Sequence, residues 1–139
     1  MTDQELKTLK ARVDADDSNA MYAYAEYIRE TNPQEANKYT IFAAQLGNPH
    51  AQERLGDQCF EDGDLENAAY YFKIGAKQGL SDCSVKLAVV NLATNETAAL
   101  RDLEELAESG IRSACLALAT YYKAHGNRKE ANFWRSLLK

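Results

Sequence analysis

The sequence contains no apolar run that approaches the roughly 18 residues a membrane-spanning helix needs. Residues 1–20, MTDQELKTLKARVDADDSNA, are charged and lack the apolar centre of a secretory signal. We therefore expect a cytoplasmic protein that does not associate with a membrane.

Cysteine is scarce, and its pattern matters more than its number. Cys59, Cys83 and Cys115 are an odd set, and no two of them form a CxxC pair. In a chain without a secretory signal, this pattern favours reduced, buried thiols. A redox or metal site is the alternative interpretation, and it lacks a paired motif.

The sequence also lacks an alternating run of β-branched residues long enough for a strand. Its two prolines, Pro33 and Pro49, each follow an asparagine, which is the order of a helix N-cap and first helical position. Hydrophobic residues make up 45% of the 139 residues, enough for a packed core. We predict an all-α fold in a single domain.

Catalytic and metal-binding motifs are missing too. The only histidines, His50 and His125, are far apart, and the sequence has no HExxH and no Gly-rich phosphate loop. Asp62, Asp64 and Glu66 alternate around a turn but lack the ligand count and spacing of a calcium loop, so we interpret them as helix-capping residues. We predict a protein that is not an enzyme and uses no cofactor or metal.

One stretch, residues 51–79, has an outline that occurs four times. Its first half places small and apolar residues on one helical face, at Ala51, Leu55, Gly56 and Cys59. Asp64 is suited to cap a second helix, and Gly79 is suited to end it in the left-handed conformation. These short helices need neighbours to be stable.

The spacing of small residues defines the repeat. A small residue opens the first helix of each pair, at Ala20, Ala51, Cys83 and Ala114. These four positions are separated by 31, 32 and 31 residues. The second helix opens at Ala36, Ala68, Ala99 and Ala131, and glycines follow 11 residues later at Gly47, Gly79 and Gly110. We predict helices near residues 3–14, 18–30, 33–46, 49–62, 64–78, 82–94, 96–109, 113–125 and 128–138.

The pattern A-x-x-x-L-G, followed by A-x-x-Y-[YF]-x-x-[AG]-A-x-x-G, resembles the Sel-one-like repeat, a relative of the tetratricopeptide repeat. Residues 51–79 carry the best match, and the resemblance covers about residues 17–139. Two features depart from the family: the loops within pairs are short, and the third copy has Asn91 where a tyrosine is usual.

The resemblance implies a right-handed α/α solenoid whose concave groove holds a protein or peptide. Its parts would be a capping helix in residues 1–16 and four repeats in one domain, at residues 17–47, 48–79, 80–110 and 111–139. In the family's superhelix the groove is lined by the stripe of each first helix that faces away from the core. Carried over, that stripe gives the predicted partner-binding residues Tyr22, Glu26, Arg29, Glu53, Asp57, Phe60, Glu61, Val85, Val89, Leu92, Leu116 and Lys123.

The predicted groove is acidic at one end and apolar at the other. Its apolar members, Val85, Val89, Leu92 and Leu116, would form a patch larger than a monomer needs to expose. The alternative is a superhelix that closes enough to bury this patch.

Charge is unevenly distributed along the chain. Residues 1–69 hold 6 basic and 14 acidic residues, whereas residues 70–139 hold 10 and 7. An acidic first half suggests a protein partner with a basic surface, although the surplus could also be merely solvating. The net charge of −5 argues against binding to nucleic acid or an anionic membrane.

These patterns favour a protein–protein interaction module, a scaffold that docks a protein or peptide. A dedicated inhibitor, such as an immunity protein that neutralises a cognate bacterial toxin, is the alternative. We expect a monomer or a weak homodimer formed through the C-terminal end. There we predict that Phe133, Trp134 and Leu137 point into the fourth pair and that Leu138 is uncovered.

Overall fold

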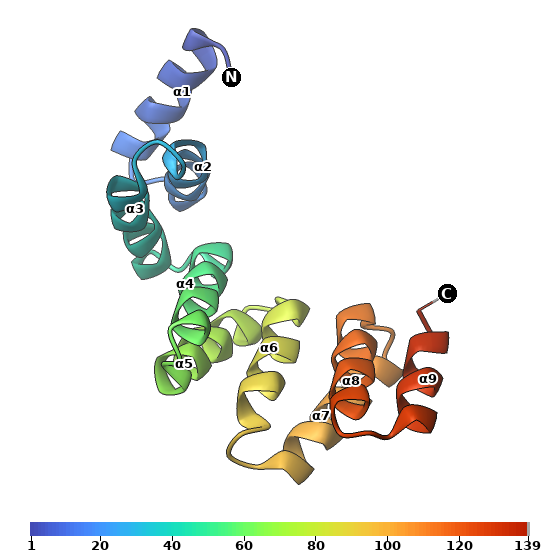
Figure 1. The fold of residues 1–139 in the computed structure, drawn as a ribbon. Coiled ribbons are helices and arrows are strands. Elements are labelled where there is room, and N and C mark those ends of the chain that lie inside the picture. Colours follow the sequence, from blue (N-terminus) through green and yellow to red (C-terminus); the bar gives the residue numbers. More distant parts are fainter. Residues whose placement is uncertain (139) are drawn as a thin grey trace. The chain divides into compact units, whose positions relative to one another are not determined.

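A computed structural model describes residues 1–138, and within them the chain forms nine α-helices and no strand (Figure 1). The all-α prediction is confirmed, and each predicted helix end lies within three residues of the observed one. The helices are α1 (Asp3–Asp14), α2 (Ser18–Ile28), α3 (Pro33–Gln45), α4 (Pro49–Glu61), α5 (Leu65–Lys77), α6 (Ser81–Asn91), α7 (Glu96–Glu108), α8 (Arg112–Ala124) and α9 (Arg128–Ser136). Among the described residues, no helix has the length and apolar character needed to cross a bilayer.

The chain divides into two compact units, Met1–Gln78 and Gly79–Lys139. In the N-terminal unit each helix from α1 to α5 packs on the next, as expected for a helical repeat. In the C-terminal unit α6 to α9 also pack in order, and α6 additionally contacts α8. The division lies one residue before the predicted junction of the second and third repeats. The single domain and the individual repeat boundaries stay predictions.

Side-chain caps explain where several helices begin. Thr2 Oγ1 accepts a hydrogen bond from the Glu5 amide at 3.1 Å, and Asn48 Oδ1 accepts one from the Ala51 amide at 3.0 Å. Each bond satisfies an amide that the first helical turn leaves unpaired. After α5, Gly79 has φ +91°, the left-handed conformation that glycine adopts without steric cost.

The small residues that open the two helices of each pair all lie in the core. The alanine or cysteine that opens each helix of a pair is buried, at Ala20, Ala36, Ala51, Ala68, Cys83, Ala99, Ala114 and Ala131. Gly56 allows a close approach, because a Cβ atom there would lie 2.6 Å from Cε1 of the buried Phe72. Small side chains therefore set how closely α4 and α5 pack.

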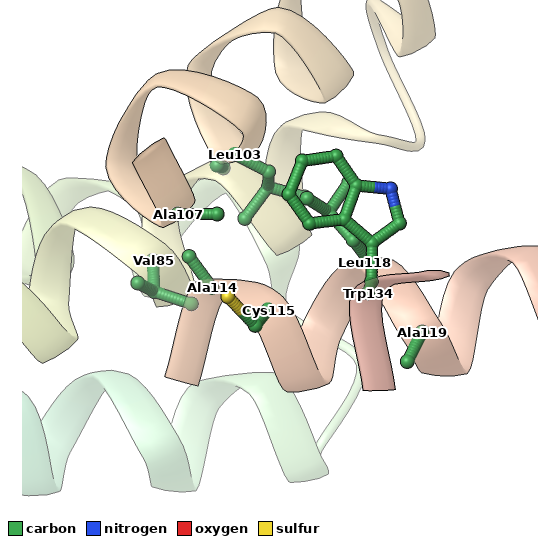
Figure 2. Packing of buried hydrophobic residues seen from close by; sticks show 9 residues of the cluster. Val85, Leu103, Ala107, Ala114, Cys115, Leu118, Ala119 and Trp134 are labelled. Carbon is green, nitrogen blue, oxygen red and sulfur yellow. The ribbon is translucent and has the colours of Figure 1, made fainter. Parts of the chain in front are cut away.

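Helices α6, α7, α8 and α9 enclose the core of the C-terminal unit. Figure 2 shows Trp134 of α9 with its six-membered ring turned toward Leu103, and Leu118 beside it. The other buried members are Val85, Ala88, Ala107, Ala114, Cys115 and Ala119. Burial of Trp134 confirms the prediction that it points into the fourth pair.

The prediction for the rest of α9 is wrong. Phe133 and Leu137 are 52% and 50% exposed, and Leu138 packs partly against the core. Ala131, Trp134 and Leu138 share the buried face at helical spacing. Phe133 and Leu137, one turn apart, consequently lie on the outer face.

Phe42 is a large apolar side chain that is substantially exposed on α3. Its neighbour Tyr39 takes the inner position and meets Tyr24 edge to face, with ring centroids 5.2 Å apart. The tyrosine pair fills the space between α2 and α3 and leaves Phe42 at the surface.

Three polar side chains are buried without having been predicted: Thr40, Asn48 and Gln52. Each has a hydrogen-bond partner, as burial requires. Gln52 Nε2 donates to the Ala44 carbonyl at 3.1 Å, and Gln78 Nε2 donates to Gln52 Oε1 at 2.7 Å. Gln52 thereby ties α4 to the end of α3 and to the residue after α5.

Candidate protein-binding site

Two contacts bring the outer sides of α2 and α4 together in the N-terminal unit. The rings of Tyr22 and His50 are stacked, with centroids 6.1 Å apart. Asn48 Nδ2 donates a hydrogen bond to Asn19 Oδ1 at 2.8 Å. Because both contacts lie near the starts of the two helices, the side chains that follow on α2 and α4 share one surface.

Charged side chains continue this surface. The Glu26 carboxylate accepts hydrogen bonds from Arg29 Nη2 at 2.7 Å and Nε at 3.2 Å, and Arg54 Nε on α4 lies 3.7 Å from it. Arg29 Nη2 also donates to Thr40 Oγ1 at 3.0 Å. Since Thr40 is buried, Arg29 holds α2 against α3 as well as contributing to the surface.

The carboxylates of α4 form a column beside this network. Glu53, Asp57 and Glu61 follow one another at four-residue spacing and so lie on one helical face. Phe60 lies next to them and is 43% exposed. We call the seven predicted residues brought together here the α2–α4 face: Tyr22, Glu26, Arg29, Glu53, Asp57, Phe60 and Glu61.

One end of the α2–α4 face is hollowed. A depression of about 420 Å³ is lined by Arg29, Asp57 and Glu61 from the predicted set, together with Pro33, Asn37, Arg54 and Gln58. Arg54 was missed in the sequence because its position lies between the buried stripe and the outer stripe of α4. Its recorded ionic contact is with Glu26 on α2, which a pattern within α4 does not reveal.

Burial is the largest influence on the ionisation of Tyr22. It raises the pKa of the phenol above its ordinary value, and the neighbouring Glu26 carboxylate raises it further. At neutral pH Tyr22 is therefore an uncharged hydrogen-bonding group beside the carboxylates. An aromatic ring with a hydroxyl is well suited to contact a partner's side chain.

The predicted apolar patch of the C-terminal unit needs correction. Val85 is 5% exposed and belongs to the core, and Val89 and Leu92 pack partly against that core. The sequence of α6 is apolar on more than one side, so both α7 and α8 pack on it. Only Leu116, at 57% exposure, is a largely exposed member of the predicted patch.

Lys123 lies in a different setting from the other predicted residues. It lines a depression of about 390 Å³ together with Gly126, Arg128, Ala131, Asn132 and Arg135. Leu116 and Lys123 are thus separate features of α8. The Ser113 hydroxyl of α8 donates a hydrogen bond to Asp82 Oδ1 of α6 at 3.1 Å. The two residues are equivalent in the repeat, because each directly precedes the small residue that opens its first helix, Ala114 or Cys83.

The three cysteines are free thiols. Burial raises the pKa of the Cys59 thiol, and the carboxylates of Asp64 and Asp62 raise it further. A raised pKa keeps a thiol protonated and lowers its reactivity. Within residues 1–138, no three His, Cys, Asp or Glu side chains are arranged to hold a metal ion.

Comparison of the chain with models of protein families finds no match, and comparison with curated protein sequences finds none either.

Proposed function

We propose that the chain is a protein–protein interaction module and that the α2–α4 face binds its partner. The observation that carries this proposal is an exposed aromatic side chain, Phe60, set among carboxylates on a surface built by two helices. Exposed aromatic residues are the usual anchors of protein interfaces, and flanking charges steer association. The partner would present a basic surface with an apolar side chain or cleft for Phe60.

The proposed architecture is the right-handed Sel-one-like solenoid of four helix pairs that the repeat pattern implies. Packing of consecutive helices within each unit supports it, as does the regular burial of the repeat's small residues. The α2–α4 face then corresponds to the groove side of the first two repeats. Val85 is not part of the proposed site, because it is buried.

A dedicated inhibitor of a basic protein, such as an immunity protein, is a second proposal. The column of Glu53, Asp57 and Glu61 favours it, because blocking a basic active site calls for an acidic surface. The number and affinity of the partners separate the two proposals. One partner bound with sub-nanomolar affinity favours the inhibitor, whereas several weaker partners favour the scaffold.

Site-specific cross-linking tests the proposed face. A photoreactive phenylalanine analogue at Phe60 is expected to capture one or a few proteins from cells of the native host, through a basic segment of each. The matched control carries the analogue at Tyr70, which is exposed on α5 of the same unit and lies outside the α2–α4 face. Equal capture of the same proteins at both positions, or capture at Tyr70 alone, would overturn the assignment.

A further inference from the structure

The N-terminal unit has an apolar depression that the α2–α4 face does not include. It has a volume of about 490 Å³ and lies between α1, α2 and α3. Its apolar lining is Val13, Met21, Tyr39, Phe42 and Leu46, and its polar lining is Asp14, Asp16 and Gln45. Leu46 is 52% exposed, and neither Asp14 nor Asp16 forms an ion pair with a described residue. We call this feature the α1–α3 hollow.

The C-terminal unit exposes a stripe with the opposite character. Lys129 and Phe133 of α9 and the C-cap residue Leu137 follow at four-residue spacing, and Leu137 keeps a helical backbone, so the three lie on one face. Half of the Phe133 and Leu137 surfaces is exposed, and Lys129 has no ion-pair partner among the described residues. We call these three residues the α9 stripe.

The segment that carries the α9 stripe has a net positive charge. Residues 112–138 contain five basic residues, Arg112, Lys123, Arg128, Lys129 and Arg135, and one acidic residue, Glu130. The hollow offers an apolar floor with two carboxylates at its edge, and the stripe offers two apolar side chains with a lysine at one end. The α1–α3 hollow and the α9 stripe are therefore complementary in shape and in charge.

We propose that the α9 stripe of one copy docks into the α1–α3 hollow of a second copy. Phe133 and Leu137, one helical turn apart, would cover the floor formed by Phe42 and Leu46. Lys129 would approach Asp14 and Asp16. The contact joins two different surfaces, so it is heterologous, and each added copy presents a fresh stripe or hollow. It uses no residue of the α2–α4 face.

Two complementary variants test this self-association by analytical ultracentrifugation. Phe133→Glu/Leu137→Glu removes the stripe, and Leu46→Glu removes the hollow. Wild-type chain is expected to form dimers and larger species as its concentration rises through the micromolar range. Each variant alone is expected to weaken association at least tenfold. An equimolar mixture is expected to form a dimer and nothing larger, because each variant keeps one intact surface.

Matched controls place the same acidic side chain nearby. Ile41→Glu changes an exposed residue of α3 that does not line the hollow, and Asn132→Glu changes an exposed residue of α9 that is not part of the stripe. Both controls are expected to associate like the wild type, and circular dichroism checks that every variant is folded. A wild type that stays monomeric overturns the proposal. So does a mixture that fails to dimerise, or association that depends on α9 alone.

Discussion

Replacing Trp134 with alanine is expected to lower the free energy of unfolding by about 3–5 kcal/mol, the usual cost of removing a buried aromatic side chain. Trp134 is 6% exposed and packs on the cluster that joins α6, α7, α8 and α9 (Figure 2). Its removal leaves a cavity that rigid neighbours such as Leu103 and Leu118 fill only in part. Urea denaturation followed by circular dichroism measures the loss, because Trp134 is the only tryptophan and its fluorescence disappears with it.

Trp134→Phe separates the contribution of aromatic packing from the cost of the buried indole N–H. The indole Nε1 is buried and has no hydrogen-bond partner among the described residues. Phenylalanine removes this donor, whose unpaired burial costs about 1–3 kcal/mol, and it keeps most of the aromatic packing. Removing the unpaired donor should stabilise the protein, and the smaller ring should destabilise it by a similar amount. We therefore expect the free energy of unfolding of Trp134→Phe to lie within about 1 kcal/mol of the wild-type value. Equal losses for the phenylalanine and alanine variants would contradict the packing described for Trp134.

Replacing Gly56 with leucine is expected to destabilise the protein by about 2 kcal/mol or more, since over-packing a tight contact costs about 1–3 kcal/mol. The new Cβ atom alone would lie 2.6 Å from Cε1 and 2.7 Å from Cδ1 of Phe72. Phe72 is buried, so its ring has little room to move away. Either α4 and α5 separate or the ring leaves its rotamer, and both options lose packing. The melting temperature measures the effect.

A double-mutant cycle identifies the source of that loss. Phe72→Ala alone should destabilise through its cavity, and adding Gly56→Leu to it should cost less than Gly56→Leu costs the wild type. Ala23→Leu is the control, because Ala23 is exposed on α2 and the added side chain meets solvent. Additive losses in the cycle, or an unchanged melting temperature for Gly56→Leu, would show that Phe72 does not restrict this position.

Local patterns account for how much of the fold could be predicted. Helix ends followed from Asn-Pro pairs and from glycines such as Gly79, because caps and left-handed ends have residue preferences of their own. The regular spacing of Ala51 and its equivalents identified the close-packed faces. Each of these signals depends on residues near one another in the sequence.

Predictions of which helix face is buried failed where more than one element packs on the same helix. Helix α6 is apolar on several sides, so a single stripe could not tell which side α8 would cover, and Val85 was misplaced. Gln52 is polar yet buried, because its amide forms hydrogen bonds with the Ala44 carbonyl of α3 and with the side chain of Gln78, the residue after α5. In α9, Trp134 fixes the buried face, and this turns Phe133 outward.

The candidate site was predictable in part for the same reason. The four-residue spacing of Glu53 and Asp57 places them on one face of a helix whatever the tertiary structure. Their proximity to Tyr22 and Glu26 depends on how α2 meets α4. The contacts that align these helices, from Asn48 to Asn19 and from His50 to Tyr22, link distant positions and have no local signature.

The rate of association with a partner captured through Phe60 tests the α2–α4 face most directly. Glu53→Lys/Asp57→Lys reverses two charges of the face, and Glu104→Lys/Glu108→Lys reverses two charges at the same spacing on α7. We expect the first variant to slow association by roughly tenfold or more at low salt, as loss of electrostatic steering predicts, with a weaker dependence on ionic strength. The α7 variant should associate at nearly the wild-type rate. Unchanged association of the Glu53/Asp57 variant, or equal slowing by both variants, would contradict the account.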